Sequence, residues 1–231
     1  MSAPEGIWAV VPVKEFTSAK QRLASHLTPE QRRALAAAMF EDVLEALAAV
    51  PELAGILVVT ADPAAADLAR RYRAHVSTDG ARSGHTAAVT AASRRLADEG
   101  RTGMITMPGD IPAITAAEVS TTLAAHKPAP SFTIVPAHDD LGSNAIICSP
   151  PDAVTLQFGD NSFFPHLDSS RRAGITPTIV RQPGIAMDID HQHDLAAFLR
   201  MTPSRPTRTR ALLERSGERP GDAVPWTPAR A

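Results

Sequence analysis

Three aspartates lie where apolar runs of the chain end, and carboxylates in such places can bind a hard divalent cation. Asp110 follows an apolar run within the motif PGDIP, whose prolines and glycine favour a turn. Asp188 and Asp190 form a D-x-D pair, which an extended backbone places on one face. Mg²⁺ takes one or two protein carboxylates and completes its shell with phosphate and water, so we predict a site for Mg²⁺ or Mn²⁺. Two structural alternatives stay open: a turn hydrogen bond at Asp110 and a helix N-cap at Asp190.

A cluster of cations follows the first apolar run. Pro12 lies near the end of this run, and Lys14, Lys20 and Arg22 come within the next stretch of the chain. Ligands of open parallel sheets bind at the carboxyl ends of strands, where fixed cations would suit a triphosphate. Neither a Walker GxxxxGK[ST] loop nor a GxGxxG loop is present, and a basic surface helix is an equally good interpretation of the cluster alone.

Two segments of small and hydroxyl residues could bind an anionic substrate. The segment GSNA contains Ser143, and the segment FGDNSF contains Gly159 and Ser162. Small side chains let backbone N–H groups approach an anion, and a helix that opens at Ser162 would attract negative charge to its N-terminus. Ordinary turns use the same residues and are the alternative.

Two histidines, His191 and His193, follow the D-x-D pair in an acidic stretch that resembles a transition-metal site. A structural zinc site is closed by nitrogen and sulfur ligands, and the sequence has one cysteine, Cys148, inside an apolar run. We therefore expect both histidines to be exposed residues of a helix's first turn. Cys148 is expected to be a packed, small hydrophobic residue rather than a nucleophile.

Apolar runs alternate with helical patterns, and this alternation predicts the frame that positions the polar residues. Continuous apolar runs, typical of strands covered on both faces, lie at residues 7–13, 55–60, 103–108, 131–136 and 144–149. Helical patterns lie at 28–47, 62–72, 83–97, 115–126, 162–173 and 191–201. Capping boxes are predicted at Thr28 and Thr115. The order of these elements predicts an α/β fold with a mainly parallel central sheet flanked by helices.

Composition limits the number of domains and the kinds of partner. The chain has 231 residues, 44% of them hydrophobic, which suits one α/β domain. A formal net charge of −2 favours neither nucleic acid nor an anionic membrane. We see no signal peptide and no membrane-spanning run, so a cytoplasmic protein is expected. Residues 1–202 are expected to form the domain, and the Pro- and Arg-rich residues 203–231 a disordered tail with at most one helical turn at 211–215.

Taken in order, these segments resemble a known family. The resemblance runs from about residue 7 to residue 200 and is carried by VPVK with AKQRL, LTPEQRRALAAAM, LVVTAD, PGDIP, GSNA, FGDNSF with His166, and DIDHQHDL. These motifs are similar to those of the CofC/FbiD guanylyltransferases of coenzyme F420 biosynthesis. The resemblance implies a single-domain, GT-A-like nucleotidyltransferase fold. It also implies that GTP and a three-carbon phosphorylated acid give a guanylyl diphosphate intermediate and pyrophosphate, the acid being 2-phospho-L-lactate, phosphoenolpyruvate or 3-phospho-D-glycerate.

Site roles follow from the resemblance, position by position. It implies metal binding by Asp110, Asp188 and Asp190, and catalytic roles for Lys14, Lys20 and Asp110. It implies that the nucleotide contacts Pro12, Lys14, Lys20, Arg22 and Asp110, and that the acid contacts Ser143, Gly159 and Ser162. The chain departs from the family motif G-L-N-A-A, near the base, where residues 84–88 read GHTAA. A downstream transferase of the F420 pathway is the implied protein partner, and a homodimer stays open.

Other functions stay open on sequence grounds. Sugar-phosphate nucleotidyltransferases and GT-A glycosyltransferases share the scaffold, although the former normally begin with a Gly-rich GxGTR-type loop where this chain has VPVKEFTSAK. A non-catalytic GTP-binding protein is an alternative of another class. The presence of all three carboxylates argues against it.

Overall fold

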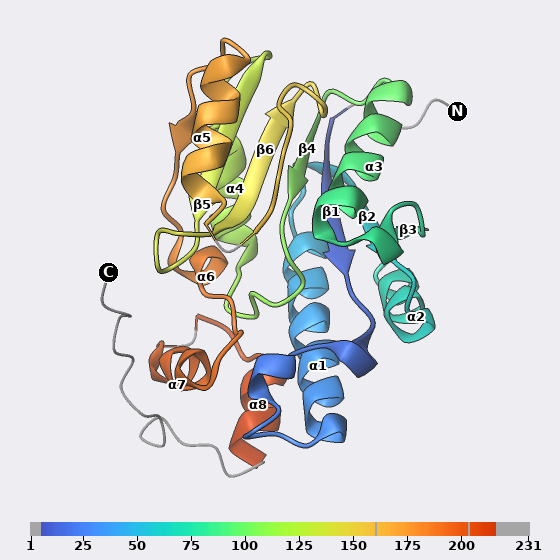
Figure 1. Ribbon diagram of the computed structural model, residues 1–231, viewed down its shortest axis with the longest axis vertical. Coiled ribbons are helices and arrows are strands. Elements are labelled where there is room, and N and C mark those ends of the chain that lie inside the picture. Colours follow the sequence, from blue (N-terminus) through green and yellow to red (C-terminus); the bar gives the residue numbers. More distant parts are fainter. Residues whose placement is uncertain (1–5, 160, 203, 216–231) are drawn as a thin grey trace.

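The computed structural model describes residues 6–159, 161–202 and 204–215, and within them it places seven strands in one sheet. The strands are β1 Ile7–Val13, β2 Leu53–Thr60, β3 His75–Ser77, β4 Gly103–Thr106, β5 Ser131–Pro136, β6 Ser143–Ser149 and β7 Thr178–Ile179. Their spatial order is β3-β2-β1-β4-β6-β5-β7. Strand β1 pairs in parallel with β2 and β4, whereas β6 runs antiparallel to both β4 and β5. The sheet is mainly parallel, as predicted, with β6 reversed (Figure 1).

Helices cover both faces of the sheet. They are α1 Pro29–Ala48, α2 Pro63–Arg71, α3 His85–Asp98, α4 Ala116–Ala124, α5 Phe163–Arg172, α6 Pro183–Ala186, α7 Gln192–Arg200 and α8 Arg208–Arg215. The helices α3 and α5 pack on one face, and α1, α2 and α4 pack on the other (Figure 1). A third apolar cluster joins α1, α7 and α8 below the sheet. Short 3-10 turns at Phe16–Ser18, Gln21–Leu23 and Ala81–Ser83 connect these elements.

Side chains alternate along β1 between two buried cores. Ala9 and Val11 belong to the core under α1, and Trp8 and Val10 belong to the core under α3. Burial on both faces explains why the strands read as continuous apolar runs. Cys148 of β6 is fully buried in the second core, and this burial raises the pKa of its thiol to about 12. The prediction that Cys148 is a packed hydrophobic residue is therefore confirmed.

Both predicted capping boxes are confirmed. At the start of α1, the Thr28 hydroxyl accepts the Gln31 N–H at 3.3 Å, and the Gln31 side chain accepts the Thr28 N–H at 2.8 Å. Thr115 and Glu118 form the same reciprocal pair at the start of α4. The strands β3 and β7 and the helix α6 were not predicted, because two to four residues are too few to show a period.

Residues 204–215 lie in the predicted tail, but the structure packs them against the domain. Within this stretch, α8 packs on α1, and Leu213 is only 2% exposed. The fully buried carboxylate of Asp42 accepts the N–H groups of Arg208 and Thr209, each at 2.9 Å. A buried carboxylate needs such donors, and the start of α8 supplies them. Residues 203 and 216–231 of the expected tail lie outside the described residues. Among the described residues, every helix is too short or too polar to cross a membrane.

Candidate active site

The predicted aspartates come together at one edge of the sheet. Because β1 and β4 are parallel neighbours, Lys14 and Asp110, which follow them, lie at the same edge. The reversed strand β6 begins at this edge and brings Asn144 there. The N–H of Ile189 donates to the carbonyl oxygen of Asp110 at 3.1 Å, so the Asp188–Asp190 segment runs beside the PGDIP turn. Ile189, between the two aspartates, is fully buried, as expected when an extended backbone places both carboxylates on the opposite face.

Lys20 lies between two of these carboxylates. Its ammonium nitrogen is 2.6 Å from Asp110 Oδ2 and 2.8 Å from Asp190 Oδ1, and its side chain is 7% exposed. Burial alone would lower the pKa of Lys20, but the charges of Asp110 and Asp190 outweigh it and raise that pKa. The pKa of Asp110 is raised by burial and by the charges of Asp190 and Asp188, against the opposing effect of Lys20. Lys20 is thus a fixed cation that bonds to two carboxylates far from it in the sequence.

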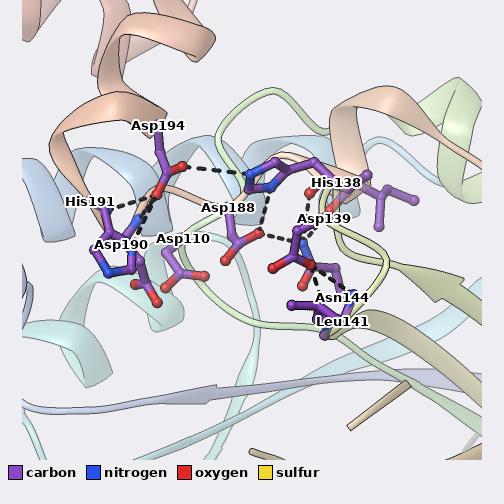
Figure 2. A network of polar contacts seen from close by, with 12 residues as sticks. Asp110, His138, Asp139, Leu141, Asn144, Asp188, Asp190, His191 and Asp194 are labelled. Carbon is purple, nitrogen blue, oxygen red and sulfur yellow. Dashed lines mark hydrogen bonds and ion pairs between the residues drawn. The ribbon is translucent and has the colours of Figure 1, made fainter. Parts of the chain in front are cut away.

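Asp188 is held by a different pair of partners. The Asn144 amide donates to Asp188 Oδ1 at 2.9 Å, and His138 Nδ1 lies 3.5 Å from the same oxygen (Figure 2). Asn144 also donates to the backbone carbonyls of Ile185 and Ala186, both in α6, which fixes its own orientation. Burial would raise the pKa of Asp188, yet the hydrogen bonds from His138 and Asn144 lower it. Asp188 therefore keeps its charge beside Asp110 and Asp190.

A cavity of about 440 Å³ opens at this edge. Its lining includes Pro12, Lys14, Lys20, Arg22, Asp110 and Asp190. All five residues predicted to contact a nucleotide therefore face one cavity. Asp190, a further predicted metal ligand, faces it too. The structure brings them together from β1, from the turns that follow β1, and from the loops before α4 and α7.

The residues predicted to contact an acid substrate form a neighbouring group. Ser143 Oγ lies 3.0 Å from His166 Nδ1, and the Ser162 hydroxyl donates to Ser143 Oγ at 3.4 Å. His166 Nε2 accepts the N–H of Gln157 at 3.0 Å, so Nδ1 carries the proton and donates to Ser143. Burial lowers the pKa of His166 to about 4, which keeps this imidazole neutral. Gly159 is exposed, with open space where a Cβ would lie.

The helix predicted to open at Ser162 is confirmed, but its serine does not cap it. Ser162 is the N-cap residue of α5 and makes no side-chain capping bond, since its backbone is already helical, with φ −79° and ψ −14°. Its hydroxyl donates to Ser143 instead. Asp190 is not an N-cap either. His191 takes that position on α7, and the carboxylate of Asp194 accepts the N–H groups of Asp190 at 2.9 Å and His191 at 2.7 Å.

Three residues of this region were not predicted from the sequence as site residues: His138, Asn144 and His85. Asn144 follows the predicted Ser143 directly, and its position in GSNA was the available signal. His85 lines the cavity at the start of α3, and its ring packs on Phe158 at a centroid distance of 4.4 Å. Burial lowers the pKa of His85 to about 4. Only the departure of residues 84–88 from the family motif pointed to it.

Known proteins of one family are similar to this chain over most of its length. A family model described as "Guanylyl transferase CofC like" matches residues 7–215. The phosphoenolpyruvate guanylyltransferase of Conexibacter woesei is 34% identical over 210 residues, which cover 89% of this chain and 94% of that protein. The 3-phospho-D-glycerate guanylyltransferase of Colwellia psychrerythraea is 32% identical over 186 residues, covering 80% of this chain and 88% of that protein.

Similarity to a solved structure concerns the fold alone. A candidate nucleotide-diphospho-sugar transferase of Desulfovibrio desulfuricans G20 superposes with a TM-score of 0.72 and 20% identity, covering 93% of this chain and 96% of that one. The predicted nucleotidyltransferase-like α/β fold is therefore confirmed. Since the family model spans nearly all the described residues, α8 included, the chain belongs to the CofC-like family of guanylyl transferases.

Proposed function

We propose that this protein transfers the guanylyl group of GTP to a three-carbon phosphorylated acid, with phosphoenolpyruvate as the first candidate. One observation carries the proposal: Lys14, Lys20, Asp110 and Asp190 line a single cavity in a chain of the guanylyl transferase family. A relative that is 34% identical is named a phosphoenolpyruvate guanylyltransferase, and one that is 32% identical is named for 3-phospho-D-glycerate. The step would belong to coenzyme F420 biosynthesis, in the cytoplasm.

The donor set suits Mg²⁺. Asp110, Asp188 and Asp190 offer only oxygen ligands, which hard cations prefer. Their side chains are between 24% and 39% exposed, so they are open to an ion carried in with a nucleotide. Lys20 already contacts one oxygen each of Asp110 and Asp190, and Arg22 lies 3.3 Å from the other oxygen of Asp190. Asp190 would therefore exchange Arg22 for the ion, while Asp188 and the second oxygen of Asp110 would complete the proposed ligands. A bound Mg²⁺ would supply positive charge beside the phosphates as negative charge builds up on the leaving group.

The reaction needs positioning more than proton transfer. A phosphate oxygen of the acid would attack the α-phosphorus of GTP, and a new P–O bond would form as the bond to the bridging β-phosphate oxygen breaks. Pyrophosphate would leave with the bonding electron pair. A phosphate monoester is already anionic at neutral pH, so no general base is required. Lys14, Lys20 and Arg22 would stabilise the charge on the triphosphate from fixed positions.

The acid would bind beside the carboxylates. Because Ser143 Oγ accepts from both His166 and Ser162, its own hydroxyl proton remains available to an anionic ligand. The exposed backbone around Gly159 allows a close approach by a phosphate or carboxylate. Neutral His166 would orient Ser143 without adding charge. The product is an energy-rich phosphoric anhydride, so we propose that a transferase of the F420 pathway consumes it.

A substrate panel tests the proposal. Purified protein is incubated with Mg²⁺ and each of GTP, ATP, CTP and UTP, paired in turn with phosphoenolpyruvate, 3-phospho-D-glycerate, 2-phospho-L-lactate or glucose 1-phosphate. Pyrophosphate is measured, and the product is trapped with a downstream transferase and a deazaflavin acceptor and identified by mass. We expect release with GTP and a three-carbon acid. Release with the sugar phosphate instead, or GTP binding with no release from any pair, would reject the proposal in favour of a sugar nucleotidyltransferase or a binding protein.

A further inference from the structure

Asp194 is a buried carboxylate with one oxygen that accepts no hydrogen bond. Its side chain is 2% exposed at the start of α7. Oδ2 accepts two backbone N–H groups, from Asp190 and His191, which fixes the orientation of the carboxylate. Oδ1 is buried and has no hydrogen-bond partner. A buried anionic oxygen in this state is unfavourable unless positive charge lies close to it.

Imidazole nitrogens surround this carboxylate. His193 Nε2 lies 3.2 Å from Asp194 Oδ1, and His191 Nδ1 lies 3.6 Å from Oδ2. One ligand atom each from His191, His193 and Asp194 can be chosen so that all lie within 4.8 Å of one another. On the other side, His138 Nε2 lies 3.6 Å from Oδ1, and its other nitrogen faces Asp188 (Figure 2).

We propose that His191, His193 and Asp194 form a second cation site, selective for a divalent transition metal such as Zn²⁺. Ligands at about 2.0–2.2 Å from a tetrahedral Zn²⁺ lie roughly 3.4 Å apart. The 3.2 Å between His193 Nε2 and Asp194 Oδ1 is close to this value, and His191 Nδ1 faces the other oxygen of the carboxylate, Oδ2, at 3.6 Å. The rings of His191 and His193 are stacked with their centroids 5.2 Å apart, so one ring must turn, and the His191 side chain is 46% exposed and free to do so.

The two sites differ in the ion that they would choose. Imidazole nitrogen favours Zn²⁺, Cu²⁺ and Ni²⁺, whereas the all-oxygen group of Asp110, Asp188 and Asp190 favours Mg²⁺. Three protein ligands leave a fourth position for water or an incoming ligand. The backbone N–H groups that hold Asp194 Oδ2 would set the direction of this ligand in advance. From the sequence alone, His191 and His193 are expected to be exposed residues without a ligand. The buried oxygen of Asp194 that has no hydrogen-bond partner changes that interpretation.

A bound ion would also stiffen the catalytic edge, by which we mean the edge of the sheet that carries Asp110, Asp188 and Asp190. Asp194 Oδ2 holds the backbone of Asp190, and His138 connects Asp194 to Asp188. An ion on Asp194 would therefore secure the segment that carries both D-x-D carboxylates. The existence of the site does not depend on the proposed function, although this consequence does.

Zinc binding to the full chain tests the inference. Zn²⁺ is titrated against a chromophoric chelator in the presence of excess Mg²⁺, and bound Co²⁺ is followed by its visible absorption. We expect one Zn²⁺ per chain, at least a tenfold loss of affinity in the double variant His191→Gln/His193→Gln, and loss of the Co²⁺ spectrum. Two control variants, His75→Gln on β3 and Asp110→Asn at the catalytic edge, should keep the Zn²⁺ affinity.

Three results would overturn the inference. One is the absence of stoichiometric Zn²⁺ binding. Another is a double variant that is folded by circular dichroism and binds Zn²⁺ as the parent does. The third is a loss of Zn²⁺ affinity in Asp110→Asn alone, which would place the ion among the catalytic carboxylates. None of these results bears on guanylyl transfer, which is measured separately by pyrophosphate release.

Discussion

Lys20→Met separates the structural role of this lysine from the nucleotide-binding role that we propose for it. Lys20 stabilises the fold by neutralising Asp110 and Asp190, and we propose that it also binds the triphosphate. The variant keeps most of the length of the side chain and removes the charge together with the N–H donors. The same change should therefore lower the stability of the metal-free protein, tighten its binding of Mg²⁺ and slow the reaction.

The stability loss can be sized from the contacts. The 2.6 Å bond to Asp110 joins two charged groups, one of them 7% exposed, and such bonds contribute about 1.5–3 kcal/mol. Asp190 is 39% exposed, so solvent screens the second bond to at most about 1 kcal/mol. A total of about 2–3 kcal/mol corresponds to a Tm lower by roughly 5–10 °C for a chain of this size. Arg22→Met, which removes an exposed cation 3.3 Å from Asp190, should cost less than about 1 kcal/mol.

Mg²⁺ should restore the stability that Lys20→Met removes. Without Lys20 the carboxylates no longer have an internal cation, so they should bind Mg²⁺ more tightly than in the parent. At about a hundred times its Kd, the ion adds about 2.7 kcal/mol of stability. The assay is thermal unfolding over a Mg²⁺ titration, paired with pyrophosphate release, which should fall about 100–1,000-fold even at saturating Mg²⁺. A variant that keeps the parental rate, or whose Tm responds to Mg²⁺ as the parent's does, would refute these roles for Lys20.

Three further predictions concern the groups around the site. Asn144→Ala should weaken Mg²⁺ binding about 10–100-fold, since it removes the 2.9 Å bond that orients Asp188; an unchanged Mg²⁺ dependence of the rate would contradict this. Leu213→Ala should destabilise the protein by about 2–4 kcal/mol in urea, because α8 is part of the core; a cost under about 0.5 kcal/mol would mean that α8 does not dock. The pKa of His166, lowered to about 4, leaves it neutral when folded while the unfolded chain takes up a proton, so acidification from pH 7 to pH 5 should cost about 2 kcal/mol through this residue. His166→Gln should remove this share of the slope, and an equal slope in both proteins would be the contrary result.

Local signals explain what could be predicted from the sequence. Thr28 and Thr115 cap their helices through residues three positions away, so their capping boxes are visible in the sequence. The D-x-D spacing likewise determines that Ile189 is buried while its neighbours face the site. Continuous apolar runs gave the main strands, because strands covered on both faces have no polar side.

Long-range contacts explain what could not be predicted. Lys20 meets Asp190 across 170 positions, and Asp42 meets Thr209 across 167. Nothing near Asp42 reveals that a Pro- and Arg-rich segment will supply its donors, so the sequence alone predicts a tail there. The pairing of Ser143 with His166 and the reversal of β6 also depend on the assembled sheet rather than on any local pattern.

The most direct test of the central claim is pyrophosphate release from GTP and phosphoenolpyruvate by the parent, Asp110→Asn and Asp188→Asn at saturating Mg²⁺. The claim is that these carboxylates, gathered from two loops, bind the ion that makes guanylyl transfer possible. We expect each substitution to slow release by about a hundredfold or more, while the variants stay folded. If both variants release pyrophosphate at near-parental rates, the carboxylates do not have this role.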